Sequence, residues 1–117
     1  MTATPRHLAQ IVVDCREPKA LVRFWARMLG VEAVDRDRGW SHVELPGGAR
    51  LAFQPVPEEK AGKNRLHLDI RVDDIGGAVA EAVGLGAVRV GGTVTDDQGA
   101  FQTMRDPEGN EFCLVTG

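Results

Sequence analysis

One pattern occurs twice in this chain, and this repeat limits the possible folds more than any other feature of the sequence. Aligning "IVVD" (11–14) with "IRVD" (70–73) superimposes the two halves at a shift of about 59 residues. Each half has the pattern of one strand, one helix and three further strands, in the order βαβββ. We therefore expect an α+β fold in which residues 1–117 form a single domain of two modules, about 7–55 and about 65–117.

The first half begins with the clearest strand and helix signals. "AQIVVDC" alternates with a β-branched bias and predicts a strand. Pro18 suits the first turn of the helix that follows, and Gly30 suits the position just after its end. The apolar stripe of this helix consists of Leu21, Phe24, Trp25, Met28 and Leu29.

The remaining segments repeat the order of elements. "VEAVD", "WSHVEL" and "ARLAFQPV" predict three strands, and polar "PEEKAGKN" predicts a linker. "RLHLDIRV" then predicts the first strand of the second half. Asp73 or Asp74 caps the next helix, which ends at Gly84. Three more strands follow in "GAVRVGG", "AFQTMRD" and "EFCLV".

Alternation along the strands predicts which side chains face away from the helices. Each helix covers one face of its sheet, and the two bare faces are expected to form a cleft. Leu68, Ile70 and Val72 belong under the second helix, so His67, Asp69 and Arg71 point away from it. The same parity argument assigns further residues to the cleft: Trp40, His42, Glu44, Gln102 and Met104.

Charge and apolar content exclude several classes of protein. The net charge of -3 with interspersed signs gives no basic stripe for a nucleic acid. No apolar run reaches the roughly 20 residues of a membrane span, and the N-terminal sequence lacks the apolar stretch of a signal peptide. Cys15 and Cys113 form no paired framework. A cytoplasmic protein with two free thiols is expected, with neither a nucleic acid nor a membrane as partner.

Three segments resemble one superfamily. "FWARMLG", "HLDIRVDD" and "DPEGNEFCLV", together with the paired βαβββ modules, are similar to the glyoxalase, bleomycin resistance protein and extradiol dioxygenase (vicinal oxygen chelate) superfamily, and most of all to its small glyoxalase-like proteins. The resemblance covers nearly the whole chain. It implies a cup-shaped mixed sheet, a homodimer and, as in the enzyme branches, a divalent metal in the cup.

The resemblance also implies where metal ligands would lie. His67 matches the ligand position on the first strand of the second module. On the first strand of the first module the position falls on Gln10, which we prefer, or on His7. On the fourth strand the usual glutamate is replaced by Gln54 or Ala52. Cys113 stands at the usual carboxylate position on the eighth strand, and Glu111 is a substitute on the same face. Because His67 is the one first-choice ligand, we expect an incomplete metal set.

Several residues have both a functional and a structural interpretation. His67 beside Asp69 forms a candidate acid/base pair, or else a neutral imidazole that shapes a pocket. Cys113 is either a small packed residue or a thiolate activated by His67. The candidate pocket residues are Gln10, Trp40, His42, Gln54, Gln102, Met104 and Cys113.

The sequence therefore leads to two main functional hypotheses. The first is a small-molecule-binding protein whose catalysis is undemonstrated. The alternative is a lyase, isomerase or dioxygenase in which a metal chelates neighbouring oxygens of a substrate. A metal-free acid/base enzyme using His67 and Asp69 is a third hypothesis. The cofactor stays unknown, with a divalent metal as the candidate, and the partner is a small organic molecule.

Overall fold

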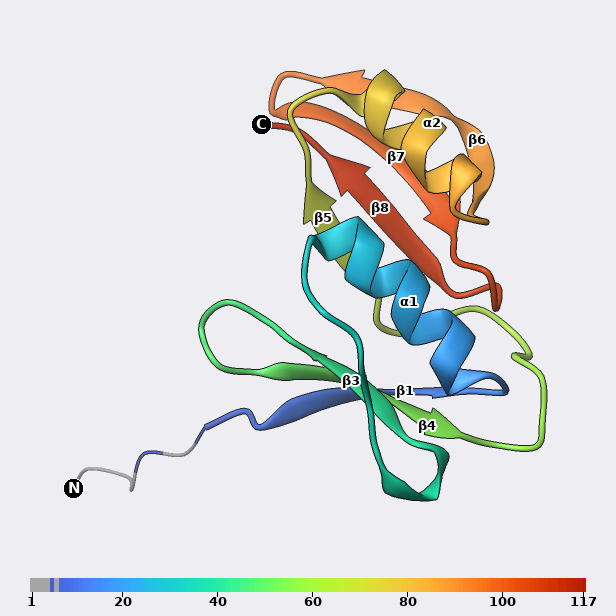
Figure 1. Ribbon diagram of the computed structural model, residues 1–117. Coiled ribbons are helices and arrows are strands. Elements are labelled where there is room, and N and C mark those ends of the chain that lie inside the picture. The colour runs from blue at the N-terminus through green and yellow to red at the C-terminus, as the bar shows by residue number, and fades with distance from the viewer. Residues whose placement is uncertain (1–4, 6) are drawn as a thin grey trace. The chain divides into compact units, whose positions relative to one another are not determined.

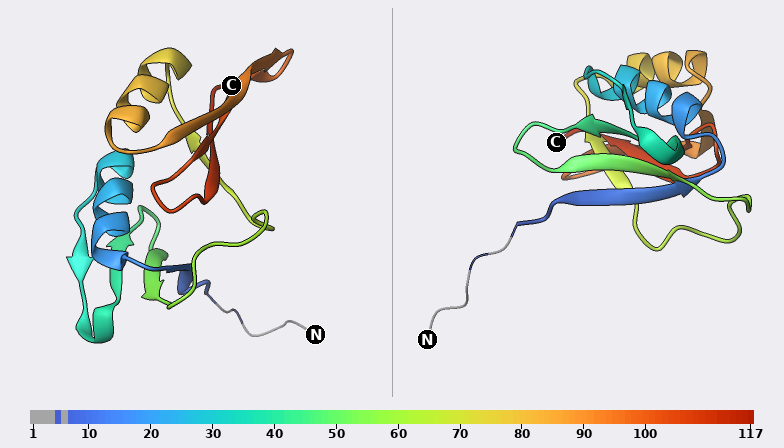
Figure 2. Two further views of the ribbon diagram at one scale, coloured as in Figure 1. Left: turned by 90° about the vertical axis from the view of Figure 1, so that its right-hand side faces the viewer. Right: turned by 60° about the horizontal axis from the view of Figure 1, so that its bottom comes forward.

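A computed structural model describes Pro5 and residues 7–117 and divides between Pro57 and Glu58 into two compact units, module 1 and module 2. Each module holds one helix and one mixed four-stranded sheet (Figures 1 and 2). The predicted α+β fold of two βαβββ modules is therefore confirmed. In the described part of the chain no strand pairing joins the two sheets. A closed cup depends on how the modules pack and stays a prediction.

Module 1 has the strand order β1-β4-β3-β2, with β1 and β4 parallel and the other pairs antiparallel. Its elements are β1 (Gln10–Cys15), α1 (Pro18–Leu29), β2 (Val34–Asp35), a 3-10 turn (Asp37–Gly39), β3 (Ser41–Glu44) and β4 (Arg50–Pro55). The observed β2 is shorter than the expected "VEAVD" segment.

Helix α1 begins and ends at the residues that its sequence favours. Pro18 occupies the first turn, where its missing N–H costs nothing, and Gly30 adopts a left-handed conformation with φ of 67° just after the last turn. The apolar stripe of α1 packs against β3 and β4. The buried core of the module includes Leu21, Val22, Phe24, Trp25, Val43, Leu51 and Phe53.

Module 2 repeats this topology with the order β5-β8-β7-β6, in which β5 and β8 are parallel. Its elements are β5 (Leu68–Arg71), α2 (Ile75–Gly84), β6 (Val88–Asp96), β7 (Gly99–Arg105) and β8 (Glu111–Val115). Asp74 caps α2, since its carboxylate accepts a hydrogen bond from the Gly77 N–H at 3.1 Å. The turn before β8 is fixed by buried Asp106, whose Oδ1 accepts from the backbone N–H groups of Glu108 and Asn110.

The pairing register of module 2 separates a buried face from an open one. Phe112 pairs with Leu68 and Met104, and Leu114 pairs with Ile70 and Gln102. The β7 and β8 members of these rows are fully or almost fully buried, on the face against which α2 packs. The alternate residues form the open face of module 2, which carries Asp69, Arg71, Phe101, Thr103, Arg105, Glu111, Cys113 and Val115. His67 directly precedes β5 and contacts Asp69.

The prediction that Gln102 and Met104 face the cleft is therefore wrong. Both side chains are 0% exposed on the helix-covered face, because the register of β7 places Gln102 opposite buried Leu114 and Met104 opposite buried Phe112. Gln102 Nε2 donates to the carbonyls of Val90, Gly91 and Thr103, and its Oε1 accepts from the Thr93 hydroxyl at 2.8 Å. The register of β6 shifts between Val90 and Val94. Gln102 thus donates hydrogen bonds to the backbone carbonyls of Val90 and Gly91, which lie at this irregularity of the β6–β7 pairing.

None of the helices in the part of the chain that the structure describes has the length and apolarity needed to cross a bilayer.

Candidate functional site

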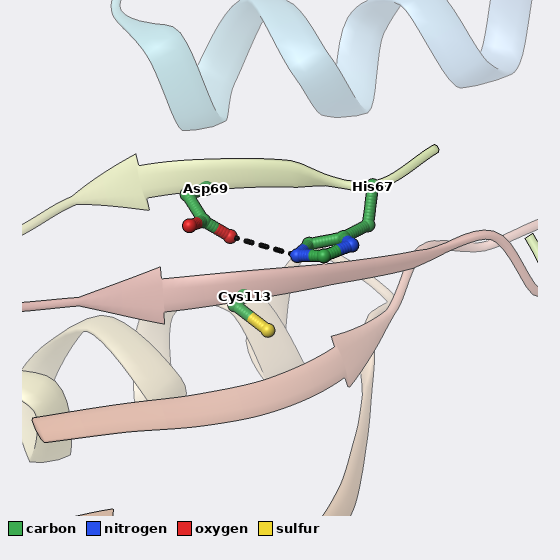
Figure 3. Close-up of side chains that lie close together, drawn as sticks. All are labelled: His67, Asp69 and Cys113. Carbon is green, nitrogen blue, oxygen red and sulfur yellow. Dashed lines mark ion pairs between the residues drawn. The ribbon is translucent and has the colours of Figure 1, made fainter. Parts of the chain in front are cut away.

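Three side chains with metal-binding or nucleophilic groups meet on the open face of module 2. They are His67, Asp69 and Cys113, whose ligand atoms all lie within 4.8 Å of one another. His67 Nε2 is 3.3 Å from Asp69 Oδ1 (Figure 3). The picture shows His67 just before β5, Asp69 on β5 and Cys113 on the neighbouring strand. We call this group the HDC cluster.

Local folding explains why these three residues meet. His67 and Asp69 are two positions apart, so alternation along the extended chain places both on one face. The parallel pairing of β5 with β8 then places Asp69 directly opposite Cys113. The sequence predicted the shared face and left contact between His67 and Asp69 open. The structure brings the two together and adds Cys113 to the same group.

The HDC cluster is accessible from solvent. The side chains of His67 and Asp69 are 60% and 56% exposed, so their ion pair is screened and adds little stability. Cys113 is half-buried, and its Sγ lies 3.5 Å from Thr103 Oγ1. The polar groups of the HDC cluster contribute little to stability and lie on the sheet face away from the helix. They are therefore available to a ligand.

The donor set fits a divalent metal that accepts nitrogen, oxygen and sulfur ligands. Tetrahedral zinc with bonds of about 2.0–2.3 Å places its donor atoms about 3.3–3.7 Å apart. The separation of His67 Nε2 and Asp69 Oδ1 is already 3.3 Å. The largest separation in the cluster is up to 4.8 Å, so the donor atoms would have to move about 1 Å closer together to share one ion. Three protein donors would leave a fourth position for a ligand.

Glu111, the other predicted metal ligand of module 2, does not join this cluster. No other His, Cys, Asp or Glu of the described residues belongs to it, so Glu111 lies outside although it shares the open face. In module 1, Gln10 pairs with Arg50 and Gln54 with Asp14. Four residues therefore separate the two glutamines along the parallel strands, or about 13 Å. Their use as ligands of one ion stays a prediction.

The two alternative positions in module 1 differ in what they offer a metal. Ala52 is fully buried and has no donor atom, and it pairs with Val12 and His42. His7 is exposed and precedes β1. Gln10, which we preferred over His7, is half-buried at the start of β1.

His42 and Trp40, both predicted to line a pocket, have different surroundings. His42 is 5% exposed, and its Nε2 lies 3.1 Å from Glu44 Oε1. Arg50 donates to the same carboxylate oxygen at 2.7 Å and so holds the pKa of Glu44 below its ordinary value. Nδ1 of His42 is buried without a hydrogen-bond partner among the described residues. Trp40 is half-buried at the end of the 3-10 turn.

Comparison with known proteins identifies the family. A family model described as "Glyoxalase-like domain" matches residues 10–115. Because this match covers most of the chain, the protein belongs to the glyoxalase-like domain family of the vicinal oxygen chelate superfamily. The resemblance noted in the sequence is thereby confirmed. No curated protein matches the sequence.

Solved structures share the fold at low sequence identity. A glyoxalase/bleomycin resistance protein/dioxygenase family enzyme from Burkholderia phytofirmans PsJN has a TM-score of 0.82 at 17% identity, covering 95% of this chain and 98% of its own. The oxidase ChaP-H2 has a TM-score of 0.76 at 22% identity, with coverages of 97% and 95%. A superfamily member from Sphaerobacter thermophilus has a TM-score of 0.71 at 18% identity, with coverages of 97% and 98%. These likenesses establish the fold alone.

Proposed function

We propose that this protein binds a small organic molecule on the open face of module 2, through a divalent metal held by the HDC cluster. The observation that carries the proposal is the convergence of His67, Asp69 and Cys113 within 4.8 Å. Imidazole, carboxylate and thiolate together favour zinc over magnesium, which prefers oxygen ligands alone. The bound metal would supply a Lewis acid for oxygens of the ligand.

The residues around the cluster indicate what the ligand looks like. Arg71 and Phe101 lie on the same open face, in the row next to Asp69, Cys113 and Thr103. Phe101 is 38% exposed, and Arg71 is exposed. A ligand with two neighbouring oxygens and a flat apolar part would place the oxygens at the cluster and the apolar part along Phe101.

Zinc binding is the first prediction. Because zinc binds the folded protein, a concentration near 100 times its Kd should stabilise it by about 2.7 kcal/mol. Thermal unfolding of metal-stripped protein should show this rise with zinc and little change with magnesium. His67→Ala and Cys113→Ser should abolish the rise, whereas Cys15→Ala, which alters the buried cysteine of module 1, should keep it. An equal rise in all four proteins would refute the proposed site.

Ligand binding is tested with a matched pair of probes. Acetohydroxamate offers two neighbouring oxygens to a metal, and acetamide lacks the second oxygen. With zinc present, acetohydroxamate should shift the backbone amide NMR signals of Asp69, Thr103 and Cys113, and acetamide should not. Identical shifts with both probes would argue against chelation.

We further propose that the bound metal supports catalysis of the lyase, isomerase or dioxygenase kind. By family resemblance we also propose that the protein is a homodimer.

A second candidate function, metal-free acid/base catalysis, is favoured by the 3.3 Å contact between His67 Nε2 and Asp69 Oδ1. In that case Asp69 would orient the imidazole, whose free nitrogen accepts a proton from the ligand. Turnover that resists chelators and whose pH profile moves in Asp69→Asn would support this second candidate over the metal.

A further inference from the structure

The loop between β2 and β3 carries an open hollow that lies entirely within module 1. It has a volume of about 590 Å³ and is lined by Arg36, Asp37, Arg38 and Trp40. None of its lining residues belongs to the HDC cluster, so the hollow is a separate feature.

The hollow has a defined shape because its loop is held at both ends. The backbone N–H of Arg36 donates to the Trp40 carbonyl at 2.7 Å, which closes the hairpin. At its base, Asp35 accepts hydrogen bonds from Arg23 at 2.9 and 3.2 Å and from the Ser41 hydroxyl at 2.9 Å. Arg23 belongs to α1, so the hairpin is tied to the helix.

Arg38 adopts a backbone conformation that is unfavourable for a side chain of its kind. Its φ is 63°, the one positive value among the described residues other than glycine. A residue in this region costs of order 1 kcal/mol or more, and such residues are concentrated at ligand sites and switch regions. Arg38 is followed by Gly39 at φ of 82°. A Cβ at Gly39 would lie 3.3 Å from Pro55, so this turn runs close to the end of β4.

The positive charges at the hollow are not neutralised by ion pairs. Arg23 and Arg50 of the same module contact Asp35 and Glu44 at 2.9 and 2.7 Å. Within the described ranges, no carboxylate lies at ion-pair distance from Arg36 or Arg38. The Arg36 guanidinium instead lies over the Trp40 ring, 5.5 Å from its centroid.

From these observations we infer a second binding site, in which Arg36, Arg38 and Trp40 hold a small organic anion with a flat ring. The guanidinium groups present planar pairs of donors that match a carboxylate. The Arg36 guanidinium covers one face of the indole, and the rest of the half-buried ring offers an aromatic surface to the ring of the ligand. Asp37 offsets one of the two positive charges, so the site favours an aromatic monoanion over a dianion such as a phosphate monoester.

Benzoate tests this inference on metal-stripped protein, where the proposed site of module 2 is inactive. Trp40 is half-buried, and the other tryptophan, Trp25, is 2% exposed in the core of the module. Benzoate at low salt should therefore give a saturable change in the fluorescence of Trp40, and Trp40→Phe should remove it. Benzamide, with the same shape and no charge, and acetate, with the charge and no ring, should each bind at least about fivefold more weakly.

Charge variants locate the site. Arg36→Gln and Arg38→Gln should each weaken benzoate binding about three- to tenfold, and Asp37→Asn should strengthen it about threefold. Arg27→Gln, an exposed arginine in the last turn of α1, should change nothing. The backbone amide NMR signals of Arg38 and Gly39 provide a second readout on the unaltered protein.

Equal affinity for benzoate and benzamide, or unchanged affinity in both arginine variants, would overturn the inference. Benzoate-induced shifts of backbone amide NMR signals that are confined to module 2 would overturn the inference as well. Each of these results leaves zinc binding by the HDC cluster untouched, so the two proposals fail independently.

Discussion

Replacing Gln102 by Ala should lower the free energy of unfolding by about 3 kcal/mol and the Tm by about 10 °C. The substitution opens a cavity under α2, because Gln102 is fully buried. It also removes the donor to three backbone carbonyls and the acceptor of the Thr93 hydroxyl. Buried polar groups left without partners are among the recognised causes of large losses of stability.

Urea denaturation of Gln102→Ala and of the unaltered protein measures this effect. Gln98→Ala is the matched control, since Gln98 is exposed in the turn between β6 and β7, and it should change the unfolding free energy by less than about 0.5 kcal/mol. A Gln102→Ala protein that kept its stability and lost ligand binding would instead support the cleft-facing role that strand parity suggested.

Replacing His67 by Ala should lower the zinc affinity of the protein by about 100-fold or more. One of the three donors of the HDC cluster is lost, and a ligand to a metal typically contributes several kcal/mol of binding free energy. Isothermal titration of metal-stripped protein with zinc measures the change. The unfolding free energy without metal should move little, because the His67 side chain is 60% exposed.

A matched substitution separates loss of a ligand from a general change on the surface. Glu81→Ala removes an exposed carboxylate of α2, outside the cluster, and should leave zinc affinity unchanged. Zinc affinity that fell equally in Glu81→Ala and His67→Ala would indicate nonspecific binding by surface groups.

The sequence predicted the fold because its strongest signals are local. Proline and glycine mark the two ends of α1, a repeated strand–helix order marks the modules, and alternation marks most strand faces. The predictions that fail concern β6 and β7, because alternation along a strand does not say which of its two faces the helix covers. Gln102 and Met104 were assigned to the wrong face, and β6 is longer than expected, with an irregular register between Val90 and Val94.

The site was predicted in part. Alternation placed His67 and Asp69 on one face, and the family resemblance pointed to Cys113. Neither could fix the register of β5 against β8, and a slip of two residues keeps every side chain on its face while changing its neighbours. The pairing of Asp69 with Cys113 therefore required the structure. The sequence predicted Trp40 as a pocket residue but did not predict the hollow beside it, because the hollow depends on the left-handed backbone at Arg38.

The central claim is that one metal ion binds His67, Asp69 and Cys113 together, and the absorption spectrum of the cobalt(II)-loaded protein tests it most directly. Cobalt(II) occupies zinc sites and gives an intense near-ultraviolet charge-transfer band when a thiolate binds it. We predict this band at one cobalt per chain, retained in Cys15→Ala and lost in Cys113→Ser, together with visible bands of tetrahedral coordination that weaken in Asp69→Asn. A stoichiometric cobalt complex without the thiolate band, or one whose band survives in Cys113→Ser, would contradict the claim.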